Sequence, residues 1–207
     1  MCNLYRTRKS LEEIARLFHA ELFPEVRGAN LTGEVYPGTP SLVVRVSEDE
    51  RTVTKMTWGF PLAQKSKKTG KPLKPRPVNN TRTDKLDSFF WRSSFQERRC
   101  LIPLTDFAEA EGPKGGKTQT WFSAPDGGIL AAAGLWRPSD EWGDCYSMVM
   151  TDANATVVPV HDRMPVLLAS QDWSNWIDGP ADKARALCEP FAGELAVDRT
   201  DEPWSAR

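Results

Sequence analysis

The run at residues 129–136 limits most strongly what this chain can fold into. It contains isoleucine, leucine, alanine, glycine and tryptophan and no charged side chain. A short, uninterrupted apolar run is typical of a strand buried on both faces. Residues 145–151 form a second such run, and further strand candidates lie at residues 42–46, 53–58 and 100–104. This pattern predicts an α+β fold with mostly antiparallel β-structure and a few peripheral helices.

The clearest helix signal follows Ser10. Ser10 and Glu13 fit a capping box, and the apolar residues after them recur on one helical face as far as Leu22. The helix should end before Pro24. Further helices are expected through residues 89–91, after Ser170 and over residues 181–188.

The length and composition favour one domain. With 207 residues, 40% of them hydrophobic, the chain can form one substantial core, and residues 190–207 are expected to be a peripheral tail. No apolar run approaches membrane-spanning length, so a cytoplasmic protein without membrane contact is expected. The four cysteines are widely spaced and only two histidines occur, which disfavours a disulfide framework or a metal site. We therefore expect no metal or other cofactor. We also expect a monomer.

Basic residues are concentrated in one segment, although the net charge is only −1. Residues 65–76 also contain glycine and prolines and no acidic residue, which predicts an irregular surface loop. Such a loop is most often simply solvated, but it can also follow the phosphates of a nucleic acid. The basic residues are Lys65, Lys67, Lys68, Lys71, Lys74 and Arg76.

Cys2 directly follows the initiator methionine. Its side chain is small, so ordinary methionine removal would leave it N-terminal, with an amine and a thiol on neighbouring carbons. Their reference pKa values, about 7.7–8.0 and about 8.5, make both groups partly unprotonated near neutral pH. An aldehyde would form an imine with the amine, and the thiol would then close a thiazolidine ring intramolecularly. The alternative is an inert residue at a mobile terminus.

Two residues are candidates for acid–base chemistry. Glu109 follows an apolar strand candidate, where partial desolvation would raise its pKa. The alternative is a surface glutamate near a hairpin. His161 lies between two proline-bounded apolar runs and is either catalytic or a hydrogen-bonded structural residue.

Other residues are candidates for contacts with a nucleic acid. Arg82 would hold a phosphate with two hydrogen bonds, and Asn80 would bind a sugar or carbonyl group, unless either one caps the following helix. Trp58 and Phe60 are either stacking platforms for bases or core aromatics.

Five motifs occur in an order that resembles one family. They are Met1-Cys2, Trp58-Gly59-Phe60-Pro61, Asn80-Thr81-Arg82, Cys100-Leu101-Ile102-Pro103 with Glu109 nine positions after Cys100, and His161-Asp162-Arg163-Met164-Pro165. With them the chain resembles the SRAP family, the SOS-response-associated peptidases or abasic-site-processing proteins. These proteins shield abasic sites in single-stranded DNA by covalent attachment. The resemblance implies a single SRAP-type domain with a barrel-like β core, and an autoprocessing peptidase activity.

The resemblance also implies a role for each matching residue. Cys2 would link to the ring-opened sugar aldehyde, and Glu109 would assist autoprocessing and proton transfer. His161 would assist at the sugar hydroxyl or leaving oxygen, and Asn80 would position the N-terminal residue. The residues implied to bind phosphates or lie beside the DNA path are Arg82, Arg163, Pro37 and Trp58.

The sequence departs from the family pattern at two places. Asn3 and Leu4 stand where glycine and arginine are common, so one DNA-backbone contact would be lost or moved. Ala108 and Ala110 replace aromatic residues beside Glu109, which would change its desolvation.

Two other functions stay open. One is a cysteine peptidase or amidohydrolase that uses Cys2 and His161 on other substrates. The other is a non-covalent single-strand binder that uses the basic segment and Trp58.

Overall fold

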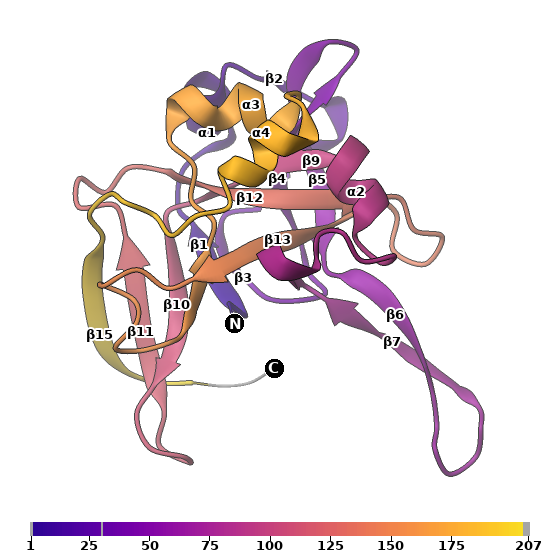
Figure 1. Ribbon diagram of the computed structural model, residues 1–207, viewed down its shortest axis with the longest axis vertical. Helices are drawn as coiled ribbons and strands as arrows, with labels where there is room; N and C mark the ends of the chain where they lie inside the picture. The colour runs from indigo at the N-terminus through magenta and orange to yellow at the C-terminus, as the bar shows by residue number, and fades with distance from the viewer. Residues whose placement is uncertain (1, 30, 205–207) are drawn as a thin grey trace.

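The computed structural model describes residues 2–29 and 31–204. Most of the strands predicted from the sequence lie in one eight-stranded sheet (Figure 1). Its centre consists of β13 (Cys145–Asp152), β12 (Leu130–Arg137), β9 (Arg99–Leu104), β4 (Pro40–Ser47) and β5 (Glu50–Trp58), paired in that order and antiparallel.

A short parallel contact nearly closes this sheet into a ring. Cys145 and Tyr146 of β13 lie opposite Thr57 and Trp58 of β5, which joins the first and the last of these five central strands. The prediction of an α+β fold with a barrel-like, mostly antiparallel core is therefore confirmed. The shorter strands β2 (Glu21–Leu22), β8 (Asn80–Arg82) and β14 (Arg163–Pro165) add to the same sheet.

A second, five-stranded sheet packs against the ring. Its order is β15 (Ala196–Pro203), β11 (Thr118–Ser123), β10 (Asp106–Glu111), β1 (Leu4–Thr7) and β3 (Gly33–Val35), all antiparallel. Only Thr105 separates β9 from β10, so the chain passes there from the ring into the second sheet. The segment expected to be a peripheral tail contains an edge strand instead, because β15 pairs with β11.

The ring strands are apolar at consecutive positions because both of their faces are covered. Leu42 and Val44 of β4 belong to a buried cluster shared with helices α1 (Leu11–Phe18) and α3 (Trp173–Ile177). Val43 belongs to a second cluster, together with Phe107 and Phe122 of the five-stranded sheet. Side chains alternate between the two faces of a strand, so one segment supplies both clusters.

The capping box of α1 is confirmed: Ser10 accepts from the Glu13 N–H, and the Glu13 carboxylate accepts from the Ser10 N–H. The helix ends at Phe18, earlier than expected, because His19 adopts a left-handed conformation (φ 49°) and the chain then forms β2.

Two other helix predictions need correction. Residues 89–91 precede α2 (Arg92–Glu97) rather than lying within a helix, because Phe90 and Trp91 pack on Phe60 at the end of the ring. Ser170 begins a 3₁₀ turn before α3 and makes no capping hydrogen bond. A helix within residues 181–188 is confirmed as α4 (Ala181–Ala186).

The basic segment forms a projecting hairpin, not an irregular loop (Figure 1). Its strands are β6 (Phe60–Lys65) and β7 (Pro72–Val78), which pair with each other as a two-stranded sheet. Prolines are tolerated in β7 because this strand pairs only with β6, and its other edge has no neighbouring strand that needs its N–H groups. All six basic side chains are exposed. Within residues 2–29 and 31–204, no helix is long and apolar enough to cross a membrane.

Candidate active site

Cys2 lies just before β1, in the layer between the two sheets. The residue is fully buried, and its thiol donates to the main-chain oxygen of Leu4 (Sγ–O distance 3.4 Å). Burial raises the pKa of the thiol well above its usual range, and the nearby charge of Glu109 raises it further. In the chain that retains Met1, the thiol is therefore protonated and out of contact with solvent. Met1, whose removal is expected, lies outside the described residues.

Two adjacent asparagines hold the main-chain oxygen of Cys2. The Nδ2 atom of Asn80 lies 2.6 Å from this oxygen, and Nδ2 of Asn79 lies 3.1 Å from it. Asn80 is buried at the start of β8, which pairs in parallel with β13 of the ring. The structure thus brings Cys2 and Asn80 together, as expected. It adds Asn79, for which the only sequence signal is the Asn79-Asn80 doublet.

Glu109 is a buried carboxyl group in the middle of the five-stranded sheet. It lies on β10 opposite Thr120 of β11, and only 2% of its surface is exposed. It shares the face of β10 with Phe107, which packs toward the ring. Burial raises the pKa of Glu109 to about 7. The alternative of a surface glutamate is therefore wrong, and the carboxyl group can both accept and donate a proton near neutral pH.

His161 faces Glu109 across the gap between the sheets. Its Nε2 lies 3.9 Å from Oε2 of Glu109, and its Nδ1 accepts from the main-chain N–H of Arg163 at 3.0 Å. Oδ1 of Asp162 also lies 3.1 Å from Nδ1. Burial lowers the pKa of the imidazole, so we assign the neutral form. Since Nδ1 is an acceptor, the hydrogen of the neutral ring is assigned to Nε2, the nitrogen 3.9 Å from Glu109.

The two predicted phosphate-binding arginines flank the end of β13. Arg82 lies opposite Met150 on one side, and Arg163 lies opposite Asp152 on the other. Arg82 forms two hydrogen bonds with Asp84, at 2.8 and 3.0 Å. Arg163 forms an ion pair with Asp152 at 2.6 Å. Both carboxylate partners are solvent-accessible, so water and salt weaken these pairs.

Of the two alternatives left open for Trp58 and Phe60, the structure shows the second: both are core aromatics. Both rings are fully buried. The Trp58 ring packs edge-on against Tyr5, with centroids 5.0 Å apart, and its Nε1 donates to the main-chain oxygen of Asn79 at 2.9 Å. Trp58 therefore holds the main chain of Asn79 in place.

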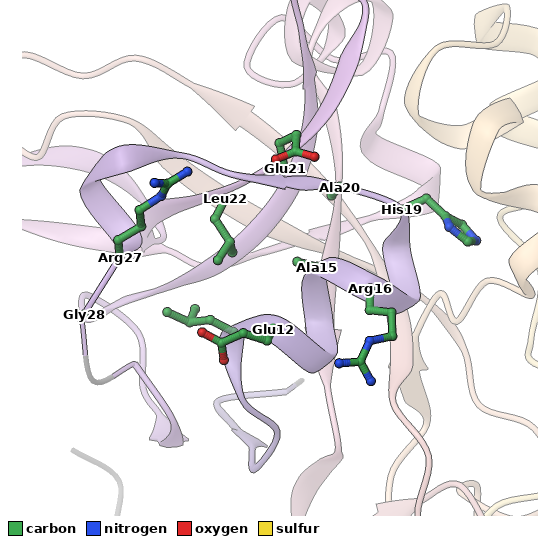
Figure 2. A pocket seen from close by; sticks show the side chains of 10 residues that line it. Glu12, Ala15, Arg16, His19, Ala20, Glu21, Leu22, Arg27 and Gly28 are labelled. Atoms are coloured by element: carbon green, nitrogen blue, oxygen red, sulfur yellow. The ribbon is translucent and has the colours of Figure 1, made fainter.

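The remaining predicted DNA contacts lie outside this cluster. Pro37 is half-buried in a loop that is tied to the ring, because the N–H of Gly38 donates to the oxygen of Trp58. Lys65, Lys67 and Lys68 lie on the projecting hairpin. A separate open hollow lies between α1 and the segment of residues 19–28 (Figure 2). None of the predicted site residues lines it.

The family described as SOS response associated peptidase (SRAP) matches residues 1–202. The chain belongs to the SRAP family. This SRAP chain is 23% identical over 202 residues to the abasic site processing protein YoqW of Bacillus subtilis (strain 168), covering 92% of this chain and 88% of that protein. It is also 23% identical over 188 residues to the abasic site processing protein YobE of the same strain, covering 86% and 82%.

Solved structures share the fold of the SRAP chain. A protein from Bordetella bronchiseptica superposes with a TM-score of 0.78 at 23% identity, covering 96% of this chain and 99% of that one. A protein from Bacteroides thetaiotaomicron gives a TM-score of 0.78 at 17% identity, covering 96% and 91%.

Proposed function

We propose that this protein captures abasic sites in single-stranded DNA through a thiazolidine link to Cys2, after Met1 has been removed. The observation that carries the proposal is that groups from different elements cluster around Cys2 and Glu109. Asn80 holds the carbonyl of Cys2, and the charge of Glu109 acts on its thiol, with His161 facing that carboxyl group. The relatives named abasic site processing proteins support the substrate class.

The reaction joins the ring-opened sugar aldehyde to Cys2 with loss of one water molecule. The amine attacks the aldehyde carbon and gives a carbinolamine, which loses water to form an imine. The thiol sulfur then adds to the imine carbon, and the thiol proton passes to the nitrogen. An imine left open would acidify the neighbouring carbon and promote strand cleavage by β-elimination. Ring closure removes the imine and so protects the strand.

Glu109 is suited to both proton transfers. Its pKa of about 7 leaves comparable amounts of acid and carboxylate at neutral pH. The carboxylate takes a proton from the attacking amine or from the thiol, and the acid gives one to the departing hydroxyl group. His161 assists at the sugar oxygen through the hydrogen on Nε2. We assign to Glu109 the removal of Met1 as well, in keeping with the peptidase named in the family description.

The DNA strand is held by cationic groups around this cluster. Arg82 and Arg163 exchange their exposed carboxylate partners for phosphates, and Pro37 lies beside the strand. Lys65, Lys67 and Lys68 on the hairpin bind phosphates farther along the DNA. These contacts depend on salt, because each neutralised phosphate releases counterions.

Denaturing electrophoresis tests the proposal directly. Purified protein is incubated with an abasic single-stranded oligonucleotide, and we expect a heat-stable adduct that is absent for Cys2→Ala. The matched control is Cys188→Ser, which changes a cysteine outside the site and should leave the adduct unchanged. Equal adduct yields for wild type and Cys2→Ala would refute the proposal. Salt-sensitive binding without any adduct would favour the non-covalent binder.

A further inference from the structure

Asn79 has no role in the reaction described so far, although it contacts the N-terminal segment twice. β7 ends at Val78 and β8 begins at Asn80, so Asn79 lies at the break between two strands. Its Nδ2 atom is 3.1 Å from the oxygen of Cys2 and 3.0 Å from Oδ1 of Asn3. A side-chain amide nitrogen carries two hydrogens, so both contacts can be formed at once.

The backbone of Asn79 is itself fixed by buried groups. Its main-chain oxygen accepts from Nε1 of Trp58 and from the N–H of Met148, each at 2.9 Å. Trp58 and Met148 are fully buried in the cluster between the two sheets. A side chain that extends from a backbone anchored in this way needs little reorganisation to present its donors.

The carbonyl group of Cys2 is held by side chains. The paired register of β1 with β10 begins at Leu4, so the ladder starts two residues after Cys2. Its carbonyl is held by Asn80 at 2.6 Å and by Asn79 at 3.1 Å. A rotation of this carbonyl would turn the amine and thiol away from Glu109, and small misplacements of reacting groups are costly in rate.

We propose that Asn79 and Asn3 form a positioning pair that fixes the mature N-terminal residue for imine formation and ring closure. This inference rests on the proposed function. Asn79 acts directly on the carbonyl of Cys2. Asn3 acts through Asn79, because it accepts one amide hydrogen and thereby orients the other one toward Cys2.

The test uses protein released from a cleavable N-terminal fusion, so that every variant begins at Cys2, as checked by intact-mass spectrometry. The variants are Asn79→Ala, Asn79→Asp, Asn3→Ala and the double alanine variant. Asn79→Asp keeps the shape of the side chain but lacks its donors. Two quantities are measured: the single-turnover rate of adduct formation at saturating abasic DNA, and the Kd for an oligonucleotide that carries a non-reactive tetrahydrofuran abasic analogue.

We expect Asn79→Ala and Asn79→Asp to slow adduct formation roughly 10- to 100-fold while the Kd changes by less than about twofold. Asn3→Ala should slow it by about threefold, as expected for one hydrogen bond. The double variant should equal Asn79→Ala, because Asn3 works only through Asn79.

Three outcomes would overturn the inference. These are a wild-type rate in Asn79→Ala, a loss confined to the Kd, and a double variant slower by the product of the single effects. If the wild type forms no adduct, the proposed function fails and the positioning role falls with it. The two failures can be told apart, because the absence of an adduct in the wild type does not depend on Asn79.

Discussion

At the scale of single residues, the buried carboxyl group of Glu109 distinguishes the site, because burying its charge costs free energy. Glu109 is almost fully buried, and that burial raises its pKa from an ordinary value of about 4.5 to about 7. Below pH 4.5 the group is neutral in both the folded and the unfolded state. Above pH 7 it is ionised in both, and the folded state then pays the penalty of the buried charge. Glu109 therefore disfavours folding increasingly as the pH rises through this window.

Glu109→Gln should consequently stabilise the protein at high pH. Relative to wild type, we expect a gain on the order of 3 kcal/mol at pH 8 and almost none at pH 4. Urea denaturation at both pH values measures the difference. Glu111→Gln is the control, because Glu111 lies on the same strand and its pKa is lowered by its hydrogen bond with Thr120. A gain that is equal at both pH values would contradict the expected titration.

A second prediction at this scale follows from the burial of Cys2. Since the thiol is fully buried in the chain that retains Met1, capture of DNA requires that removal of Met1 expose it. In a Cys188→Ser background, which removes the one partly exposed cysteine, iodoacetamide should alkylate the processed protein much faster than protein that keeps Met1. Mass spectrometry identifies the alkylated residue. Equal, slow labelling of both forms would show that the site stays closed and would count against DNA capture.

At the scale of elements, the β6–β7 hairpin should contribute to the affinity for DNA but not to the rate of adduct formation. Replacing Lys65, Lys67 and Lys68 by glutamine should weaken binding of single-stranded DNA at low salt. The slope of log K against log salt should become shallower by about 2, since each phosphate contact contributes about 0.7. The adduct rate at saturating DNA should change little, because these lysines lie outside the Cys2 cluster.

Fluorescence anisotropy at several salt concentrations measures that slope. A triple variant of Arg16, Arg27 and Lys183 to glutamine is the matched control, because it removes the same charge from other elements and should leave the slope unchanged. Equal changes in the two triple variants would mean that only net charge matters.

The base of the hairpin depends on Gly59. This residue has φ +118°, and a Cβ added there would lie 2.4 Å from Cβ of Pro77. Gly59→Ala should therefore destabilise the protein by roughly 2–4 kcal/mol, through both backbone strain and the clash. Gly70→Ala at the hairpin tip is the control. It also has a positive φ (+69°) but open space around it, so its cost should be about 1 kcal/mol or less. Equal costs in denaturation experiments would rule out the clash.

At the scale of the whole molecule, the site exists because two sheets face each other. Glu109 comes from the five-stranded sheet, whereas Asn80 and Trp58 come from the ring and His161 from the loop before β14. Cys2 lies between them, two residues before β1, a strand of the second sheet. An error in how the layers pack would therefore separate the base from the nucleophile, even with every strand intact.

The sequence by itself determined the local features of this protein. Continuous apolar runs predicted the ring strands, and the Ser10–Glu13 capping box predicted the start of α1, because both patterns depend on residues close together in the chain. The ordered motifs indicated the family. Only the tertiary structure decided that Trp58 is buried, that the basic segment is a hairpin and that Asn79 reaches Cys2. Those properties depend on which distant segment covers a side chain, and no local pattern in the sequence encodes that.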